Sequence, residues 1–160
     1  MASFNTPIGL ASKGLATNAS LTANLGRIYV QDGLILKLVR TSAALTSIAK
    51  QAALDAGATT FTNTVASVTA GATHRFLGLF PVGQIDLASG DFAMVVCGGV
   101  TTGVCGAATT AGNALNTAAT GRLTNDSGAY TAATCAQAVG IALQTQTTGN
   151  DVAVQIAYRG

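Results

Sequence analysis

Regular alternation of apolar and small or polar residues near the C-terminus constrains the fold of this chain most. From residue 151 to 158, one face of a strand would carry Val152, Val154, Ile156 and Tyr158, and the other Asp151, Ala153, Gln155 and Ala157. A similar segment precedes it, with Val139, Ile141 and Leu143 on one face and Ala138, Gly140, Ala142 and Gln144 on the other. Side chains alternate between the two faces of a strand, so both segments are predicted to be half-buried antiparallel strands.

Turn residues predict a β-hairpin in the first third of the chain. Asp32-Gly33 separates two β-type runs, residues 27–31 and residues 34–40. Asp-Gly between such runs is a strong hairpin signal, because both central positions of the favoured turn need a positive φ.

Two more apolar runs predict strands in the middle of the chain. Residues 76–80 are followed by Pro81, which cannot donate to a β-ladder and so ends the strand. Residues 92–97 are apolar on both faces, as in a strand inside a core or an interface. Gly98-Gly99 is expected to bend or bulge that strand.

Residues 42–56 are open to two interpretations. Leu45, Ile48, Ala49 and Ala52 recur at helical spacing before Gly57, which predicts a short amphipathic helix. A loop with a brief strand is the alternative. The whole chain is therefore expected to be mainly β, an antiparallel β-barrel or sandwich with at most one short helix.

The chain divides by composition into an extended N-terminal arm, residues 1–26, and a single β domain, residues 27–160. The arm is almost uncharged, and its leucines follow neither a helical nor a strand period. Disordered tails are normally well charged or rich in proline. We therefore expect the arm to become ordered across a neighbouring subunit, with a disordered tail as the alternative.

Charged residues are scarce, at 9% of the chain, and the sequence contains no Glu and no Trp. A free monomer usually carries more surface charge to stay soluble, so partners are expected to cover much of this surface. The net charge is only +2, and the eight basic residues are scattered along the chain, which argues against nucleic-acid binding. No segment resembles a signal peptide or a continuous apolar span, so a soluble protein made in a cytoplasm, without membrane contact, is expected.

Titratable residues show no catalytic pattern, and an enzyme is not expected. The six Asp residues fall mostly in or beside predicted turns, and His74, the single histidine, has no acid or cysteine near it in sequence. We predict no catalytic residue, no metal site and no cofactor. The three cysteines, Cys97, Cys105 and Cys135, are expected to be buried thiols, although Cys97 and Cys105 could face each other across a hairpin and form a bridge after cell lysis.

Several short pieces, taken in order, carry a resemblance to a known family. They are Leu38-Val39-Arg40, Gly90-Asp91-Phe92 with Gly98-Gly99, Ala111-Gly112-Asn113-Ala114-Leu115, Gly121-Arg122-Leu123, and Ala138-Val139-Gly140-Ile141-Ala142-Leu143. In this order the chain resembles the capsid cement, or head decoration, proteins of tailed bacteriophages. The resemblance covers most of the chain except the arm, and it departs from the family at Asn113, where Asp is frequent.

The resemblance implies a mainly β protein on the outer surface of a virion, at junctions between capsomers, often as a homotrimer. Its partner would be the major capsid protein, and its role to stabilise the capsid by bridging neighbouring subunits. A surface adhesion or carbohydrate-binding module is the alternative. Such a module should expose aromatic rings for stacking on sugars, and aromatic residues make up only 5% of this chain.

Overall fold

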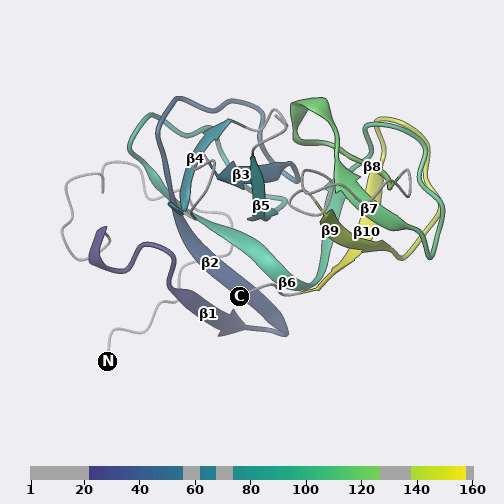
Figure 1. Ribbon diagram of the computed structural model, residues 1–160, viewed down its shortest axis with the longest axis horizontal. Helices are drawn as coiled ribbons and strands as arrows, with labels where there is room; N and C mark the ends of the chain where they lie inside the picture. Colours follow the sequence, from purple (N-terminus) through teal and green to yellow (C-terminus); the bar gives the residue numbers. More distant parts are fainter. Residues whose placement is uncertain (1–21, 56–61, 68–73, 127–137, 158–160) are drawn as a thin grey trace.

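The computed structural model describes residues 22–55, 62–67, 74–126 and 138–157 (Figure 1). Its named elements are ten strands and one 3-10 turn. The bounds, in chain order, are β1 (Ile28–Gln31), β2 (Leu34–Thr41), β3 (Ala52–Asp55), β4 (Thr64–Ser67), β5 (Arg75–Leu79), β6 (Phe92–Val104), β7 (Ala114–Thr117), η1 (Ala119–Gly121), β8 (Leu123–Asn125), β9 (Ala138–Ala142) and β10 (Asp151–Ile156). The predicted mainly β fold is confirmed.

Five strands close into a barrel in the order β2-β4-β3-β5-β6, and β6 returns to pair with β2. The β2–β4 pair is parallel, and the other pairs of the ring are antiparallel. Strand β1 pairs with β2 outside the ring. A second group of strands continues from β6 in the order β10-β9-β7-β8, all of them antiparallel, and lies beside the barrel in Figure 1.

Strand β6 belongs to both halves of the molecule because of its length. Its first half pairs with β2 in the barrel, and its second half, from Gly99 to Val104, pairs with β10. The register with β2 shifts where Ile35 lies opposite Gly98 and Leu36 opposite Val96. Gly99 has a φ of 96°, so the predicted bend or bulge at Gly98-Gly99 is confirmed.

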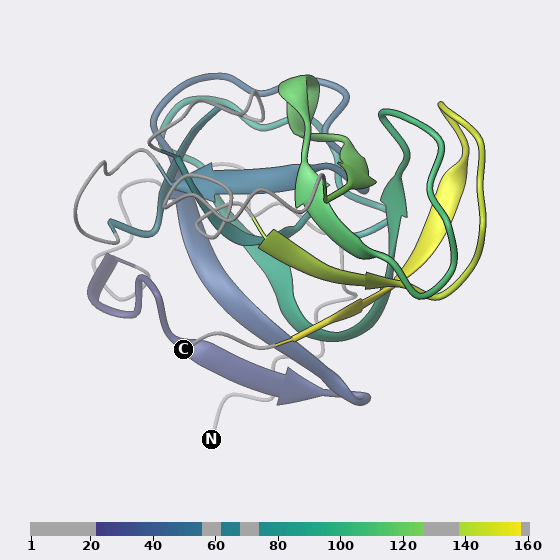
Figure 2. The same ribbon diagram turned by 45° about the vertical axis from the view of Figure 1, so that its right-hand side comes forward.

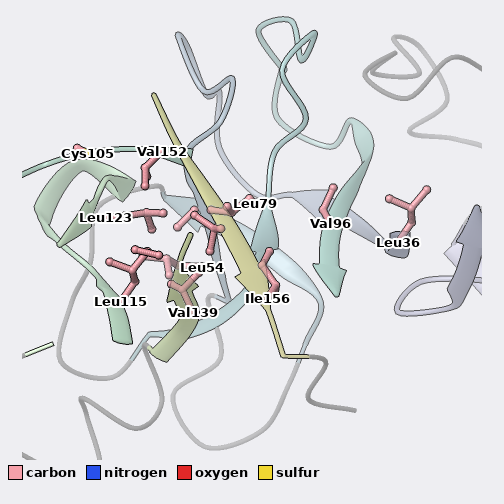
Figure 3. Close-up of a cluster of buried hydrophobic side chains, with 13 residues drawn as sticks. Leu36, Leu54, Leu79, Val96, Cys105, Leu115, Leu123, Val139, Val152 and Ile156 are labelled. Atoms are coloured by element: carbon pink, nitrogen blue, oxygen red, sulfur yellow. The ribbon is translucent and has the colours of Figure 1, made fainter. Parts of the chain in front are cut away.

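Two hydrophobic cores lie on opposite sides of the barrel wall. The barrel interior is filled by Val39, Leu45, Ile48, Ala53, Val65, Leu77, Phe80, Leu87, Ala93 and Val95. The second core lies between the outside of the barrel and strands β7 to β10, and Figure 3 shows its side chains. Its buried members are Leu36, Ala52, Leu54, Leu79, Val96, Cys105, Leu115, Leu123, Val139, Ala142, Val152, Val154 and Ile156.

The apolar segment 92–97 of β6 separates these two cores. Val95 points into the barrel interior, while Val96 is part of the second core and Met94 packs against it. The prediction of a strand with two buried faces is therefore confirmed. Both faces are covered by this chain itself, so the segment gives no evidence for contact with another subunit.

The predicted hairpin is confirmed, with β1 and β2 joined by the two residues Asp32 and Gly33. Their φ values are 50° and 78°, as a primed two-residue turn requires. The turn packs against β6, since a Cβ atom on Gly99 would lie 2.6 Å from the carbonyl oxygen of Gly33.

The helix predicted for residues 42–56 is wrong, and the alternative, a loop followed by a brief strand, is correct. Residues 42–51 form an irregular loop, and β3 begins at Ala52. Leu45 and Ile48 are buried in the barrel interior, which accounts for their apolar character without a helix. Ser47 and Lys50 have φ values of 54° and 64°, which no α-helix contains.

The faces predicted for the segment around β9 are also wrong. Val139 is buried, but Ile141 and Leu143 are each 48% exposed and Ala142 is buried in their place. In the pairing with β7, Leu115 lies opposite Gly140 and Asn116 opposite Ala138, so Val139 is an extra residue. This bulge reverses the alternation after Val139.

The possible bridge between Cys97 and Cys105 is excluded by their positions. Cys97 lies within β6 and Cys105 directly follows its end, so extended chain separates them instead of a hairpin turn. Both are buried free thiols, as the main prediction stated. Cys135 lies outside the described residues, and so does most of the arm, so the division at residue 26 stays a prediction.

Candidate binding face

The candidate site is the outward face of β6, β10 and β9, which turns away from the second core. Gln155 in β10 lies opposite Val100 in β6 on one side and opposite Ile141 in β9 on the other. The next row contains Thr102, which lies opposite Ala153. The backbone N–H of Leu143 donates to the carbonyl oxygen of Ala153 at 2.8 Å, which extends this row beyond β9.

We call these six residues the aliphatic face: Val100, Thr102, Ile141, Leu143, Ala153 and Gln155. Val100 is 53% exposed, and Ile141 and Leu143 are 48% exposed. Single exposed apolar residues are common on protein surfaces, but here three of them share one face in two adjacent rows, with Val100 on one side of β10 and Ile141 and Leu143 on the other. Exposed apolar side chains that gather on one face are typical of surfaces that contact a partner, so this face is the candidate binding site.

Charge is almost absent from this part of the described surface. The six residues of the aliphatic face are all uncharged. Asp151 follows on the same side of β10, and its Oδ2 accepts a bond from Nζ of Lys50 at 2.6 Å. The pair is exposed, so it contributes little stability, but it neutralises the carboxylate at the end of the face.

The bulge in β9 and a close strand contact together create the face. The bulge turns Ile141 and Leu143 outward, and Ala142 inward. A Cβ atom on Gly140 would collide with the backbone carbonyl of Gln155, so only glycine permits β9 to approach β10 this closely here. The exposed position of Ile141 therefore depends on the conformations of Val139 and Gly140.

Sequence reasoning predicted no site residue, and it missed the aliphatic face. The outward positions of Ala153 and Gln155 followed correctly from the alternation in β10. Ile141 and Leu143 were assigned to a buried face, because a bulge leaves no clear signal in the alternation itself. The pairing of Val100 with Gln155 joins distant parts of the sequence, so it could not be read from either segment alone.

Acidic and cysteine residues do not gather into a site in the part of the chain that the structure describes. Asp55 is fully buried, and it accepts bonds from the backbone N–H of Thr62 and Asn63 and from the Thr62 hydroxyl. Asp91 accepts a bond from the N–H of Ala88 in a turn. Both carboxylates hold loops in place, and no described group of three potential metal ligands lies together.

The structure also describes His74 and Cys97, two titratable residues considered in the sequence analysis. His74 lies directly before β5 and is half-buried. Burial raises the pKa of the Cys97 thiol, an effect that nearby Lys37 partly offsets.

None of the helices among the described residues has the length and apolar character needed to cross a bilayer.

Comparisons with known proteins give little guidance. No protein-family model matches this chain, and no curated protein matches it. Among solved structures, the chain is similar to the head fiber gp8.5 N base in bacteriophage phi29, with 14% identity over 78% of this chain and 94% of that chain, and a TM-score of 0.44. A TM-score of this size establishes neither a shared fold nor a shared role.

Proposed function

We propose that this chain is a virion structural protein that decorates the outer surface of a phage capsid and stabilises it by bridging neighbouring capsid subunits. The observation that carries the proposal is the aliphatic face, where three exposed aliphatic side chains flank β10 on a surface with little charge. The resemblance to capsid cement proteins, which rests on short motifs, supplies the kind of partner. No catalytic step is part of this role.

The aliphatic face would bind the major capsid protein through apolar contact. Burial of apolar surface contributes about 25 cal/mol per Å², so Val100, Ile141 and Leu143 would supply the centre of such a contact. Binding to the assembled shell and not to its separated subunits would stabilise the shell by mass action, by about 2.7 kcal/mol at a free concentration 100 times the Kd.

Self-association belongs to the same proposal, since cement proteins often act as trimers. The scarcity of charged residues supports an oligomer. The apolar strand at residues 92–97 gives no such support, because its two faces are covered within one chain. The homotrimer therefore rests on the resemblance alone. Analytical ultracentrifugation of the purified chain would measure the oligomeric state directly.

The alternative, a carbohydrate-binding module, has less support from the described aromatic residues. Phe80 and Phe92 are buried, and Phe76 and Tyr29 pack against the second core. A sugar-binding surface would need exposed rings on which pyranose faces can stack. A glycan array tests this role, and specific binding to one glycan class would favour it over the capsid role.

The stabilising role has its own test. Heads that lack this protein and heads that carry it are heated, and DNA release is followed with an intercalating dye. We expect release at a lower temperature from the depleted heads, and recovery when the purified chain is added back. Identical release temperatures for the two kinds of head would contradict the stabilising role.

A further inference from the structure

Within the described part of the chain, strand β1 is an open edge of the β-structure. Among the described residues it pairs with β2 alone, at Leu34 to Lys37, while β6 pairs with the other side of β2 and β4 pairs with β2 farther along, at Arg40 and Thr41. Figure 2 shows β1 at the periphery of the molecule, with β2 between it and β6. An open edge presents backbone N–H and C=O groups that another strand can pair with.

The turn geometry determines which groups of β1 point outward. In a hairpin with a two-residue turn, the residues that flank the turn, here Gln31 and Leu34, form a hydrogen-bonded pair. Bonded and non-bonded pairs then alternate, so the groups of Arg27, Tyr29 and Gln31 face β2. The N–H of Leu38 does donate to the carbonyl oxygen of Arg27, at 3.1 Å. The backbone groups of Ile28 and Val30 therefore face the open edge.

This edge lacks the features that usually prevent pairing. Protected edges carry lysines, prolines or bulges. The sequence of β1 is Ile-Tyr-Val-Gln, with neither charge nor proline, and its register with β2 is continuous. Val30 is 77% exposed, the highest value among the large apolar residues of the described chain.

We propose that two copies of this chain pair antiparallel through their β1 strands about a two-fold axis centred at Tyr29. A two-fold axis perpendicular to the sheet leaves each side chain on the same face of the sheet. Residues that lie opposite each other must share a face, so an even-numbered residue can lie opposite only an even-numbered residue of the partner, and an odd-numbered one opposite only an odd-numbered one. In this register Ile28 lies opposite the partner's Val30, and both residues have outward backbone groups. Each such pair exchanges N–H···O bonds, and its two aliphatic side chains meet on one face.

Charge favours the same arrangement over a parallel one. Arg27 precedes β1 and Asp32 follows it, so the two ends of the strand carry opposite charges. Antiparallel pairing places the Arg27 end beside the partner's Asp32 end, whereas parallel pairing would place like charges together. A second copy of β1 is thus complementary to this edge in hydrogen bonding, apolar contact and charge.

The first experiment compares two lysine variants by sedimentation velocity at protein concentrations from about 5 to 300 µM. Val30→Lys puts a charge opposite Ile28 of the other copy, while Val82→Lys makes the same change at a valine that is 59% exposed outside β1. We expect the wild-type chain and Val82→Lys to dimerise, or to pair as hexamers where the homotrimer forms, and Val30→Lys to pair in this way at least about tenfold more weakly. A wild-type monomer throughout this range, or equal association of the two variants, would overturn the proposal.

A second experiment tests the register and does not depend on Val30. Arg27 lies opposite the partner's Gln31, so a mixture of Arg27→Cys and Gln31→Cys chains should form an intermolecular disulfide under mild copper-phenanthroline oxidation. Each variant alone, and the wild-type chain, should give little cross-linked product, and circular dichroism checks that both variants are folded. Equal cross-linking in the mixture and in the single-variant samples, or none in the mixture, would overturn the two-fold register.

Discussion

The carbonyl oxygen of Gly33 lies so close to Gly99 that a Cβ atom at position 99 would come within 2.6 Å of it. Gly33 is in the turn of the β1–β2 hairpin, and Gly99 is at the bend of β6. The contact therefore fixes the hairpin against the strand that joins the barrel to the aliphatic face. A change at Gly99 should affect both regions.

Gly99→Ala is expected to destabilise the protein by more than about 2 kcal/mol, because the side chain is strained at a φ of 96° and also collides with Gly33. Gly112→Ala is the matched control. Its φ is 85°, but a Cβ atom there meets nothing within 4 Å, so only the backbone strain of about 1 kcal/mol applies. Urea unfolding measures both. Equal losses in the two variants would show that the Gly33 contact relaxes freely.

Asp55→Asn is expected to cost roughly 3 kcal/mol of unfolding free energy. The buried carboxylate accepts three bonds, at 2.8 Å from Thr62 N, 2.6 Å from Thr62 Oγ1 and 2.9 Å from Asn63 N. The side-chain NH2 of an asparagine would face one or more of these N–H and O–H donors, so those hydrogen bonds would be lost. Asp86→Asn is the control, because exposed Asp86 accepts a bond from Ser47 N and should cost less than about 1 kcal/mol. A cost for Asp55→Asn as small as that of the control would contradict this role.

Cys97 should make stability depend on pH in the alkaline range. Burial raises the pKa of its thiol above the ordinary value of 9.0. The unfolded chain therefore loses this proton first, and the contribution of Cys97 is complete below pH 9 and declines as pH rises through the folded pKa. Urea unfolding at about pH 7 and pH 10 should show a larger loss for the wild type than for Cys97→Ala. Equal losses would show that burial of this thiol has no effect on its titration.

Local chemistry made several elements predictable from the sequence. Asp32-Gly33 fixed the hairpin, because few residues accept positive φ at both turn positions. The alternation in β10 correctly predicted buried Val152 and Val154, since no bulge interrupts that strand. The apolar segment 92–97 was correctly expected to be buried on both sides.

The errors came from contacts between distant parts of the chain. Leu45 and Ile48 have helical spacing, yet both fill the end of the barrel from an irregular loop. Regular alternation placed Ile141 inside. The bulge at Val139, which turns Ile141 outward, depends on the pairing with β7 and could not be read from the segment alone. The aliphatic face needs three strands brought side by side, so no single segment could predict it.

The central claim is that the aliphatic face binds a capsid, and co-sedimentation with heads that lack this protein tests it most directly. The wild-type chain and Val82→Lys should pellet with the heads to the same saturable occupancy. The double variant Ile141→Lys/Leu143→Lys should lose at least about tenfold in affinity, since two buried charges replace apolar contact, while its melting temperature stays near that of the wild type. Absence of the wild-type chain from the pellet, or equal occupancy by the double variant, would contradict the account.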